Sequence, residues 1–342
     1  MHNFTAHRLR LVADVNTTIE LNEHQGSALR GALYHALRTR FCTNRAAEEC
    51  STCQLVGACP VAMLVSTLVT GGKRGRDVPR PYTIQPPLPG TGHPQRRRDG
   101  TTVYRYEPGE ELRFGLTLYA RALQLFPYIV MAMMEMQERG IGRRTRHEGG
   151  HWRRGTFTLQ RVWTENPLTG EQQPVISEGD RVVQVPDLPV THRQVLSWAA
   201  DAVPGGRVRV AFMTPTRLIE RGKLVKPHSF RFRPFFQRLL DRVEALSQVF
   251  TDTPQKFDFP SLIAAAAEVR TVENTLCWEE LRSYSTRQRR DTPTSGLMGQ
   301  VAFEADDWSP FLPWIGWGQY IHVGKDAVKG NGWYEVELSW RP

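Results

Sequence analysis

The order of strand-like and helix-like patterns constrains the fold of this chain more than any other sequence feature. Alternating apolar residues predict strands, and apolar residues at helical spacing predict helices. In the first half the predicted strands are 5–20, 82–84, 111–119 and 156–163, and the predicted helices are 25–40 and a second helix beginning near Pro127. The order is therefore strand, helix, strand, strand, helix, strand, which is that of a ferredoxin-like domain.

The second half repeats this order less regularly. Its predicted strands are 207–218, 276–284, 297–303 and a last strand from Tyr334. Its predicted helical segments are 235–250 and 261–269, and a short helix or turn is predicted over 308–317. We therefore expect an α+β protein of two tandem ferredoxin-like (RRM-like, βαββαβ) domains. The expected boundaries are 1–165 for the first domain, 166–205 for a linker with irregular strands, and 206–342 for the second domain.

Composition points to a polyanionic partner. The 342 residues include 44 Lys and Arg against 35 Asp and Glu, a net charge of +9, which favours nucleic acid first and an anionic membrane surface second. No apolar signal segment stands near residue 1, and no apolar run is long enough to cross a bilayer. The sequence predicts a soluble, cytoplasmic protein.

Four of the five cysteines fall within eighteen residues, spaced Cys42-x7-Cys50-x2-Cys53-x5-Cys59. In a reducing cytoplasm such a cluster indicates metal ligation before disulfides, and a Cys-x2-Cys pair suits tetrahedral zinc. We expect a small structural zinc insertion at about 42–60. Free thiols, an iron–sulfur cluster or a redox pair are the alternatives.

The last part of the chain, residues 316–336, carries five glycines, two lysines and a histidine before its final strand. We expect a flexible cationic loop whose glycine backbone approaches a phosphate-rich ligand. It lacks the Gly-Lys-Ser/Thr ending of a Walker loop, so a mononucleotide site is not expected. The alternative is a mobile hairpin turn with incidental lysines.

The helix predicted over 25–40 has two unlike faces. Leu29, Leu33 and Leu37 form an apolar stripe, whereas Gly31, Tyr34, His35 and Arg38 lie towards the opposite face. A basic and aromatic face is therefore left for something outside the core. Residues 139–154 form the densest basic segment, predicted as a loop with aromatic residues interleaved; a solvated charge run is the alternative.

Seven short motifs in order along the chain resemble a known family. They are Leu29-Arg30-Gly31-Ala32-Leu33, the cysteine insertion ending Cys59-Pro60, Gly140-Ile141-Gly142, Thr214-Pro215-Thr216-Arg217-Leu218, Arg282 to Gln288, Gly296-Leu297-Met298-Gly299, and His322 to Gly332. The chain resembles the RAMP superfamily, specifically the CRISPR precursor-RNA-processing endoribonucleases, the sixth family of Cas proteins. Each motif is weak alone, and their order over the full length is fairly specific.

This resemblance implies cleavage within CRISPR repeats by the RNA 2′-hydroxyl, giving 5′-hydroxyl and 2′,3′-cyclic-phosphate ends without a catalytic metal. His35 is the first candidate acid or base because it lies off the apolar stripe and titrates near neutrality. The other candidates for catalysis are Tyr34, His24, His322 and Lys325. The alternative for His35 is a surface histidine without function.

Basic and glycine residues are the candidates for holding the RNA. They are Arg38, Arg143, Arg144, Arg146, Arg153, Arg154, Arg287, Arg289, Arg290, Gly324, Lys325, Lys329, Gly330 and Gly332. The expected partners are CRISPR repeat RNA or crRNA and other Cas effector subunits, with no membrane and no small-molecule cofactor. Two alternatives are a non-catalytic RAMP subunit that binds guide RNA in an effector complex, and a general zinc-stabilised RNA-binding module.

Overall fold

The computed structural model describes residues 1, 3–47, 49–66, 79–88, 90–146, 150–177, 182–201, 206–285 and 290–338. The chain forms two compact units. The N-terminal unit comprises residues 7–166 and 170–189, and the C-terminal unit comprises 1–6, 167–169 and 190–342.

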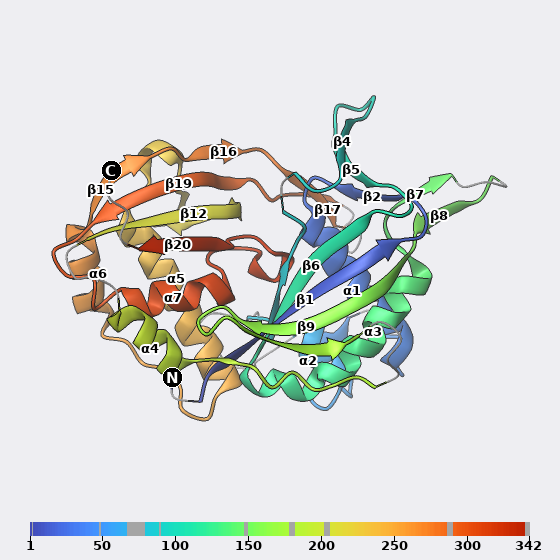
Figure 1. The fold of residues 1–342 in the computed structure, drawn as a ribbon, viewed down its shortest axis with the longest axis horizontal. Helices are drawn as coiled ribbons and strands as arrows, with labels where there is room; N and C mark the ends of the chain where they lie inside the picture. The colour runs from blue at the N-terminus through green and yellow to red at the C-terminus, as the bar shows by residue number, and fades with distance from the viewer. Residues whose placement is uncertain are drawn as a thin grey trace. The chain divides into compact units, whose positions relative to one another are not determined.

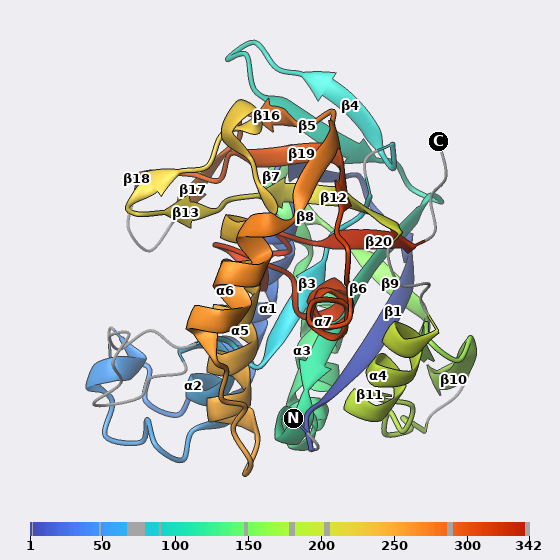
Figure 2. The same ribbon diagram turned by 90° about the vertical axis from the view of Figure 1, so that its left-hand side faces the viewer.

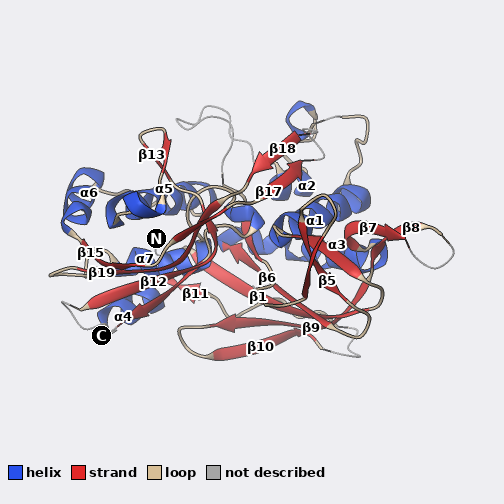
Figure 3. Cartoon of the chain, turned by 90° about the horizontal axis from the view of Figure 1, so that it is seen from above, coloured by secondary structure: helices blue, strands red, loops and turns tan. Residues whose placement is uncertain are grey.

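The N-terminal unit is built on a sheet with the order β10-β9-β1-β6-β3. Its strands are β1 (Thr5–Val15), β3 (Tyr82–Gln85), β6 (Glu111–Tyr119), β9 (Phe157–Asn166) and β10 (Glu171–Ile176). Helices α1 (Gln25–Phe41) and α3 (Phe126–Arg139) cover one face of this sheet (Figures 1 and 3). The predicted apolar stripe of α1 is confirmed, because Leu29, Leu33 and Leu37 are all buried.

Two hairpins extend from this unit where the sequence predicted loops and one longer strand. The strand predicted over 5–20 ends at Val15, and a separate strand β2 (Ile19–Asn22) pairs with β5 (Thr102–Tyr106) and, through it, with β4 (His93–Arg96). The basic segment predicted as a loop over 139–154 contains the antiparallel strands β7 (Ile141–Arg146) and β8 (Trp152–Gly155). Successive side chains of β7 and β8 therefore point to opposite faces of this hairpin, as they would not in an irregular loop.

The cysteine segment follows α1 directly. It contains a 3-10 turn η1 (Cys50–Thr52) and a short helix α2 (Pro60–Val65) that starts just after Cys59, with a proline in its first turn, where the missing N–H costs nothing. Val61, Ala62, Leu64 and Val65 are buried. The segment is thus attached to the unit by α2.

The C-terminal unit is built on a sheet with the order β15-β19-β12-β20, and β16 also pairs with β19. The strands are β12 (Arg207–Thr216), β15 (Arg270–Asn274), β16 (Cys277–Glu279), β19 (Gly296–Glu304) and β20 (Tyr334–Leu338). Its helices are α4 (His192–Ala200), α5 (Phe232–Phe250), α6 (Phe259–Glu268) and α7 (Leu312–Ile321), of which α5 and α7 pack together (Figure 2).

Short hairpins and 3-10 turns complete the elements. The hairpins are formed by β13 (Ile219–Glu220) with β14 (Lys223–Leu224), and by β17 (Arg282–Ser285) with β18 (Arg290–Pro293); β11 (Val190–Thr191) pairs with the start of β1. The 3-10 turns are η2 (Ala120–Leu125), which leads into α3, η3 (Pro227–Ser229), which precedes α5, and η4 (Ala327–Lys329), which follows α7.

An aromatic core fills the C-terminal unit. Phe232 stacks on Phe236 with ring centroids 5.3 Å apart, and both contact Phe311 edge-on. Tyr334 of β20 meets Phe235 at 5.3 Å. These rings are fully or almost fully buried, and aromatic pairs of this kind contribute beyond the area that they bury.

The glycine-rich end is not the flexible loop that the sequence predicted. Residues 312–321 are helix α7, and Gly316 and Gly318 are buried within it. A Cβ at Gly318 would meet the Tyr334 hydroxyl oxygen at 1.8 Å, so glycine is needed there for close packing rather than for flexibility.

The fold is mixed α/β with antiparallel sheets in both units. Among the residues that the structure describes, no helix is both long and apolar enough to cross a membrane.

Candidate active site

His35 stands on the solvent side of α1. Its side chain is exposed, while Leu33 and Leu37 on the same helix point into the core. The helical period that buries the leucines thereby presents the imidazole outward. The neighbouring Tyr34 ring lies edge-on to it at 5.4 Å between centroids.

Positive charge surrounds the His35 imidazole. Partial burial lowers the pKa of His35 from its ordinary value, and the guanidinium groups of Arg154, Arg30 and Arg38 lower it further. Both causes disfavour the imidazolium. His35 is consequently neutral at pH 7, with a nitrogen lone pair that can accept a proton.

Arg154 reaches His35 from the β7–β8 hairpin. The register pairs Arg144 with Arg154 and Arg146 with Trp152, so these four side chains share one face of the hairpin. The Arg154 guanidinium donates to the carbonyl oxygen of Gly142. Partial burial and the like charge of Arg144 lower the pKa of Arg154.

Two glycines, Gly142 and Gly155, allow this hairpin to pack closely against β2 and the residues just before it. A Cβ at Gly142 would meet the Glu20 carbonyl oxygen at 2.2 Å, and a Cβ at Gly155 would meet that of Thr18 at 2.2 Å. Only residues without a side chain allow this approach. Arg143 of β7 also donates to the Asn22 side-chain oxygen at 3.3 Å, so the hairpin has a defined position relative to α1 and β2.

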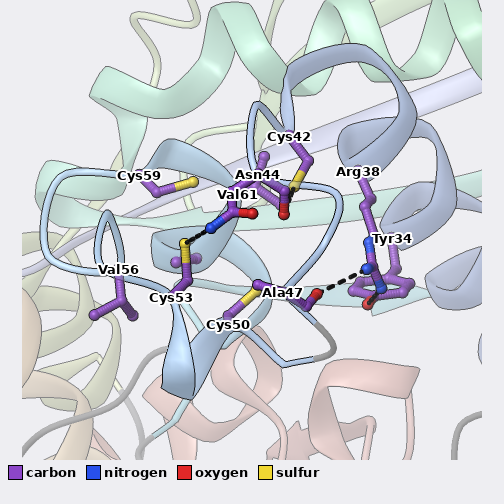
Figure 4. A pocket seen from close by; sticks show the side chains of 11 residues that line it. Tyr34, Arg38, Cys42, Asn44, Ala47, Cys50, Cys53, Val56, Cys59 and Val61 are labelled. Carbon is purple, nitrogen blue, oxygen red and sulfur yellow. Dashed lines mark hydrogen bonds between the residues drawn. The ribbon is translucent and has the colours of Figure 1, made fainter.

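Tyr34 and Arg38 point to a pocket beside α1 (Figure 4). Arg38 donates to the Tyr34 hydroxyl at 3.2 Å and to the Ala47 carbonyl oxygen at 3.1 Å. The Arg38 guanidinium thus ties α1 to the cysteine segment. Its predicted contact with RNA would compete with these two bonds.

All four clustered cysteines line this same pocket. Asn44 connects two of them, since its side-chain amide donates to the Cys53 sulfur at 3.6 Å and its backbone carbonyl oxygen accepts from the Cys42 thiol at 3.5 Å. Burial raises the pKa of the Cys50 thiol, and Cys59, Cys42 and Cys53 raise it further. Four thiols that line one pocket have the chemistry that a soft metal ion prefers. In the described part of the chain, however, no three ligand-type side chains lie close enough together to hold a metal ion in their present positions.

His24 lies at the N-terminus of α1 and is buried, with 5% of its surface exposed. Its Nδ1 shares a short hydrogen bond with the Ser27 hydroxyl. As placed, this imidazole serves the helix start and does not face solvent beside His35.

His322 ends α7 and is fully buried in the C-terminal unit. Its Nδ1 lies 3.2 Å from the Asn331 carbonyl oxygen, and its ring stacks on Trp333. The structure therefore gives His322 a place in the core. Lys325 nearby is exposed, whereas Lys329 pairs with Asp326 at 2.9 Å.

The glycine amides at this end are used inside the protein. The Gly330 N–H donates to the Ala327 carbonyl oxygen at 3.0 Å, and the Gly332 N–H donates to that of Pro215 at 3.2 Å. A Cβ at Gly324 would meet the Arg217 carbonyl oxygen at 2.5 Å. These glycines, expected to approach RNA with their backbone, instead allow the chain to fold tightly on itself.

The remaining predicted RNA contacts divide by position. Arg143, Arg144, Arg146, Arg153 and Arg154 come together on the β7–β8 hairpin. Arg287 and Arg289 lie outside the described residues, and only the backbone of Arg290 is described, in β18. Sequence reasoning missed Arg30 as a site residue, although its place four residues before Tyr34 puts its guanidinium 5.5 Å from that ring.

Two family models match the sequence of this chain. One describes an N-terminal domain and matches residues 4–188. The other describes the CRISPR-associated endoribonuclease Cas6 and matches residues 210–334.

Residues 210–334 of the chain thus match the Cas6 family of CRISPR-associated endoribonucleases. This match confirms the resemblance to the CRISPR precursor-RNA-processing endoribonucleases. His35 and the β7–β8 hairpin fall within the first match, and the buried glycine-rich segment falls within the second.

Solved structures of similar fold agree with the family. A product complex of a Cas6 from Thermus thermophilus has a TM-score of 0.54 at 14% identity, covering 97% of this chain and 99% of that one. A partial Cas6-RT-Cas1–Cas2 complex has a TM-score of 0.59 at 11% identity, covering 99% of this chain and 47% of that one. At these identities the similarity shows the Cas6 fold alone. No curated protein matches the chain in sequence.

Proposed function

We propose that this chain cleaves CRISPR repeat RNA in precursor crRNA, with His35 as the general base. The observation that carries this proposal is the exposed His35 imidazole on α1, held neutral beside Arg30 and Arg154. A neutral imidazole and nearby guanidinium groups are what a phosphate-transfer reaction at neutral pH requires.

The proposed reaction is an attack by the RNA on itself. His35 takes the proton from the ribose 2′-oxygen, which bonds to the adjacent phosphorus. The bond from phosphorus to the 5′-oxygen then breaks, and that oxygen gains a proton. The products are a 2′,3′-cyclic phosphate and a 5′-hydroxyl, and no step uses a catalytic metal.

Arginine guanidinium groups offset the charge that develops during this step. The phosphorane carries more negative charge than the starting phosphate, and preorganised cations stabilise it selectively. The charges of Arg154, Arg30 and Arg38 all act on the His35 imidazole and lower its pKa. Lys325, exposed in the C-terminal unit, stays a candidate for phosphate binding.

Each unit is proposed to be a ferredoxin-like domain. In the N-terminal unit the elements β1, α1, β3, β6, α3 and β9 follow one another, and the sheet neighbours are β9-β1-β6-β3. In the C-terminal unit the corresponding elements are β12, α5, β15, β19, α7 and β20, with the neighbours β15-β19-β12-β20. In both, the first and third strands are central, which supports the assignment.

We further propose that the cysteine segment binds one structural zinc ion through Cys42, Cys50, Cys53 and Cys59. Support comes from four free thiols lining one pocket and from the Cys-x2-Cys pair. Zinc would draw the sulfurs together as thiolates and would stabilise the segment that Arg38 links to α1. The cleavage reaction does not pass through this ion.

The partners follow from the proposed activity. Repeat RNA and its crRNA product are the ligands, and other Cas proteins are candidate partners. A structure of similar fold is that of a Cas6-RT-Cas1–Cas2 complex, which supports association with such proteins.

Removal of the imidazole tests the proposed function. We expect His35→Ala to slow single-turnover cleavage of the cognate repeat by roughly 100- to 10,000-fold, the usual contribution of general acid–base catalysis, with RNA affinity nearly unchanged. His228→Ala is the matched control, because His228 is also exposed but lies on the turn η3. Wild-type cleavage by His35→Ala would remove His35 from the mechanism. A wild-type protein that binds repeat RNA and never cleaves it would instead be a non-catalytic RAMP subunit.

A further inference from the structure

Trp152 leaves a large aromatic surface in water. It lies on β8 and is 64% exposed, whereas Trp308, Trp317 and Trp333 are fully buried or nearly so. Among the large apolar side chains that are exposed in the described residues, it alone is aromatic. Burying an indole in the core is the ordinary outcome, so an exposed one on a paired strand suggests a binding role.

The face around Trp152 is strongly cationic. Trp152 is paired directly with Arg146, and Arg154 and Arg144 lie one step along the same face, while Arg153 and Thr145 point to the opposite face. Arg144, Arg146 and Arg154 are exposed. A single aromatic ring among three guanidinium groups suits a strand of nucleic acid, in which bases stack and phosphates pair with cations.

We propose that Trp152 stacks on an unpaired base of the bound RNA, close to the ribose that reacts at His35, while Arg144 and Arg146 hold the flanking phosphates. This inference rests on the proposed function. It names a stacking residue that selects unpaired RNA beside the cut, because a paired base has no free face to offer.

The spacing of the hairpin supports closeness to the reacting ribose. Helix α1, which carries His35, packs against β7, and Trp152 of β8 pairs with Arg146 of that strand. Trp152 and Arg154 are two residues apart on β8, about 6.6 Å along the strand, and the charge of Arg154 acts on His35. This is of the order of one nucleotide step in an extended strand. The stacked base therefore belongs within about two nucleotides of the cut.

Variants on the two faces of the hairpin can be compared: two at Trp152 on one face and one at Arg153 on the other. Trp152→Ala removes the stacking surface, Trp152→Phe retains part of it, and Arg153→Ala removes a cation from the opposite face. The side chains of Trp152 and Arg153 are both exposed, so the variants are expected to unfold at the wild-type temperature.

The experiment places 2-aminopurine, whose fluorescence falls on stacking, at each unpaired position of a repeat RNA with a 2′-deoxy cut site. With the full-length wild type we expect quenching at one position within two nucleotides of the cut. Trp152→Ala should abolish it and weaken binding roughly 5- to 150-fold. Trp152→Phe should restore part of both. Arg153→Ala should keep the quenching of bound RNA, while its affinity falls if Arg153 contacts a phosphate as the sequence predicts.

Two outcomes overturn the inference: no position is quenched by the wild type, or Trp152→Ala keeps both the quenching and the affinity. Quenching only at a distant position would refute the placement near the cut. Quenching and affinity are both measured on uncleaved RNA at every unpaired nucleotide. Stacking by Trp152 is therefore tested even if the wild type never cleaves RNA. Failure of cleavage would count against the proposed function alone.

Discussion

At His35 the same residues set both the charge of the candidate base and the charge around its substrate. The imidazole is exposed enough to meet a ligand, yet burial and three arginines lower its pKa. A lowered pKa keeps the proton-accepting form available further into acid than for an ordinary histidine. The arginines that tune the base are also suited to hold the phosphate.

This arrangement predicts a shift in the pH dependence of an Arg154 variant. The acid limb of kcat/KM reports protonation of the base in the free enzyme. Arg154→Ala removes a positive charge and some desolvation, both of which now lower the pKa of His35, so the pKa rises and the limb moves to higher pH. Measured cleavage at pH 6 should fall relative to that at pH 8.

The matched control keeps the charge. Arg154→Lys should leave the acid limb near its wild-type position even if the overall rate drops through weaker phosphate contact. An acid limb that stays in place in Arg154→Ala, or moves to lower pH, would contradict His35 as the titrating base.

At the scale of secondary-structure elements, the close packing of the β7–β8 hairpin against β2 depends on glycine. Gly142 has φ +77°, and a Cβ there would meet the Glu20 carbonyl oxygen at 2.2 Å. Gly150 has φ +81°, but its Cβ would meet nothing closer than 3.8 Å. The two positions share a positive φ and differ in the space around the missing side chain.

We therefore expect unequal costs for alanine at the two glycines. Gly150→Ala should lower the free energy of unfolding by about 1–2 kcal/mol, the cost of a left-handed conformation for a residue with a Cβ. Gly142→Ala should lower it by about a further 1–3 kcal/mol through overpacking against β2. Urea unfolding measures the free energy of unfolding of both variants. Equal decreases would show that Gly142 does not pack closely against β2.

The cysteine segment is tested by its metal content. We expect one zinc per wild-type chain by elemental analysis, lost in Cys50→Ser together with several degrees of melting temperature. Cys277→Ser is the control, because Cys277 is exposed on β16 outside the cluster. Full metal retention by Cys50→Ser, or no metal in carefully reduced wild-type protein, would contradict the zinc site.

Elements with regularly spaced apolar residues could be predicted from the sequence, and the others could not. Strand β6 occupies 111–119 as predicted, and α1 ends within one residue of its predicted end, because apolar residues recur at strand spacing in the first and at helical spacing in the second. Strands β7 and β8 are rich in arginine and lack this spacing. The short helix or turn predicted over 308–317 covers the first part of helix α7, whereas its last turn was interpreted as loop. The reason is its glycines, whose role, close approach to Tyr334, depends on the tertiary structure.

Of the candidate site, only the outward position of His35 could be predicted from the sequence. Helical spacing placed His35 away from the leucine stripe. The partnership of His35 with Arg154 follows from strand register and from the glycine contacts of the hairpin, which no local pattern encodes. Likewise, spacing suggested His322 as a loop residue, whereas the fold buries it.

For the whole molecule, two units of similar strand order and a net charge of +9 suit a protein that binds RNA. Much of the binding free energy should come from phosphate contacts, so affinity for repeat RNA should depend strongly on salt. The chemistry, in contrast, depends on a single atom of the substrate, the 2′-oxygen at the cut.

Cleavage of a cognate repeat RNA with one 2′-deoxy nucleotide at the cut, in the presence of a chelator, tests the central claim most directly. We predict that the unmodified RNA is cleaved in chelator to a 2′,3′-cyclic phosphate and a 5′-hydroxyl, and that the 2′-deoxy RNA binds but stays intact. Cleavage of the 2′-deoxy RNA at the same position, or loss of all cleavage in chelator, would contradict the account.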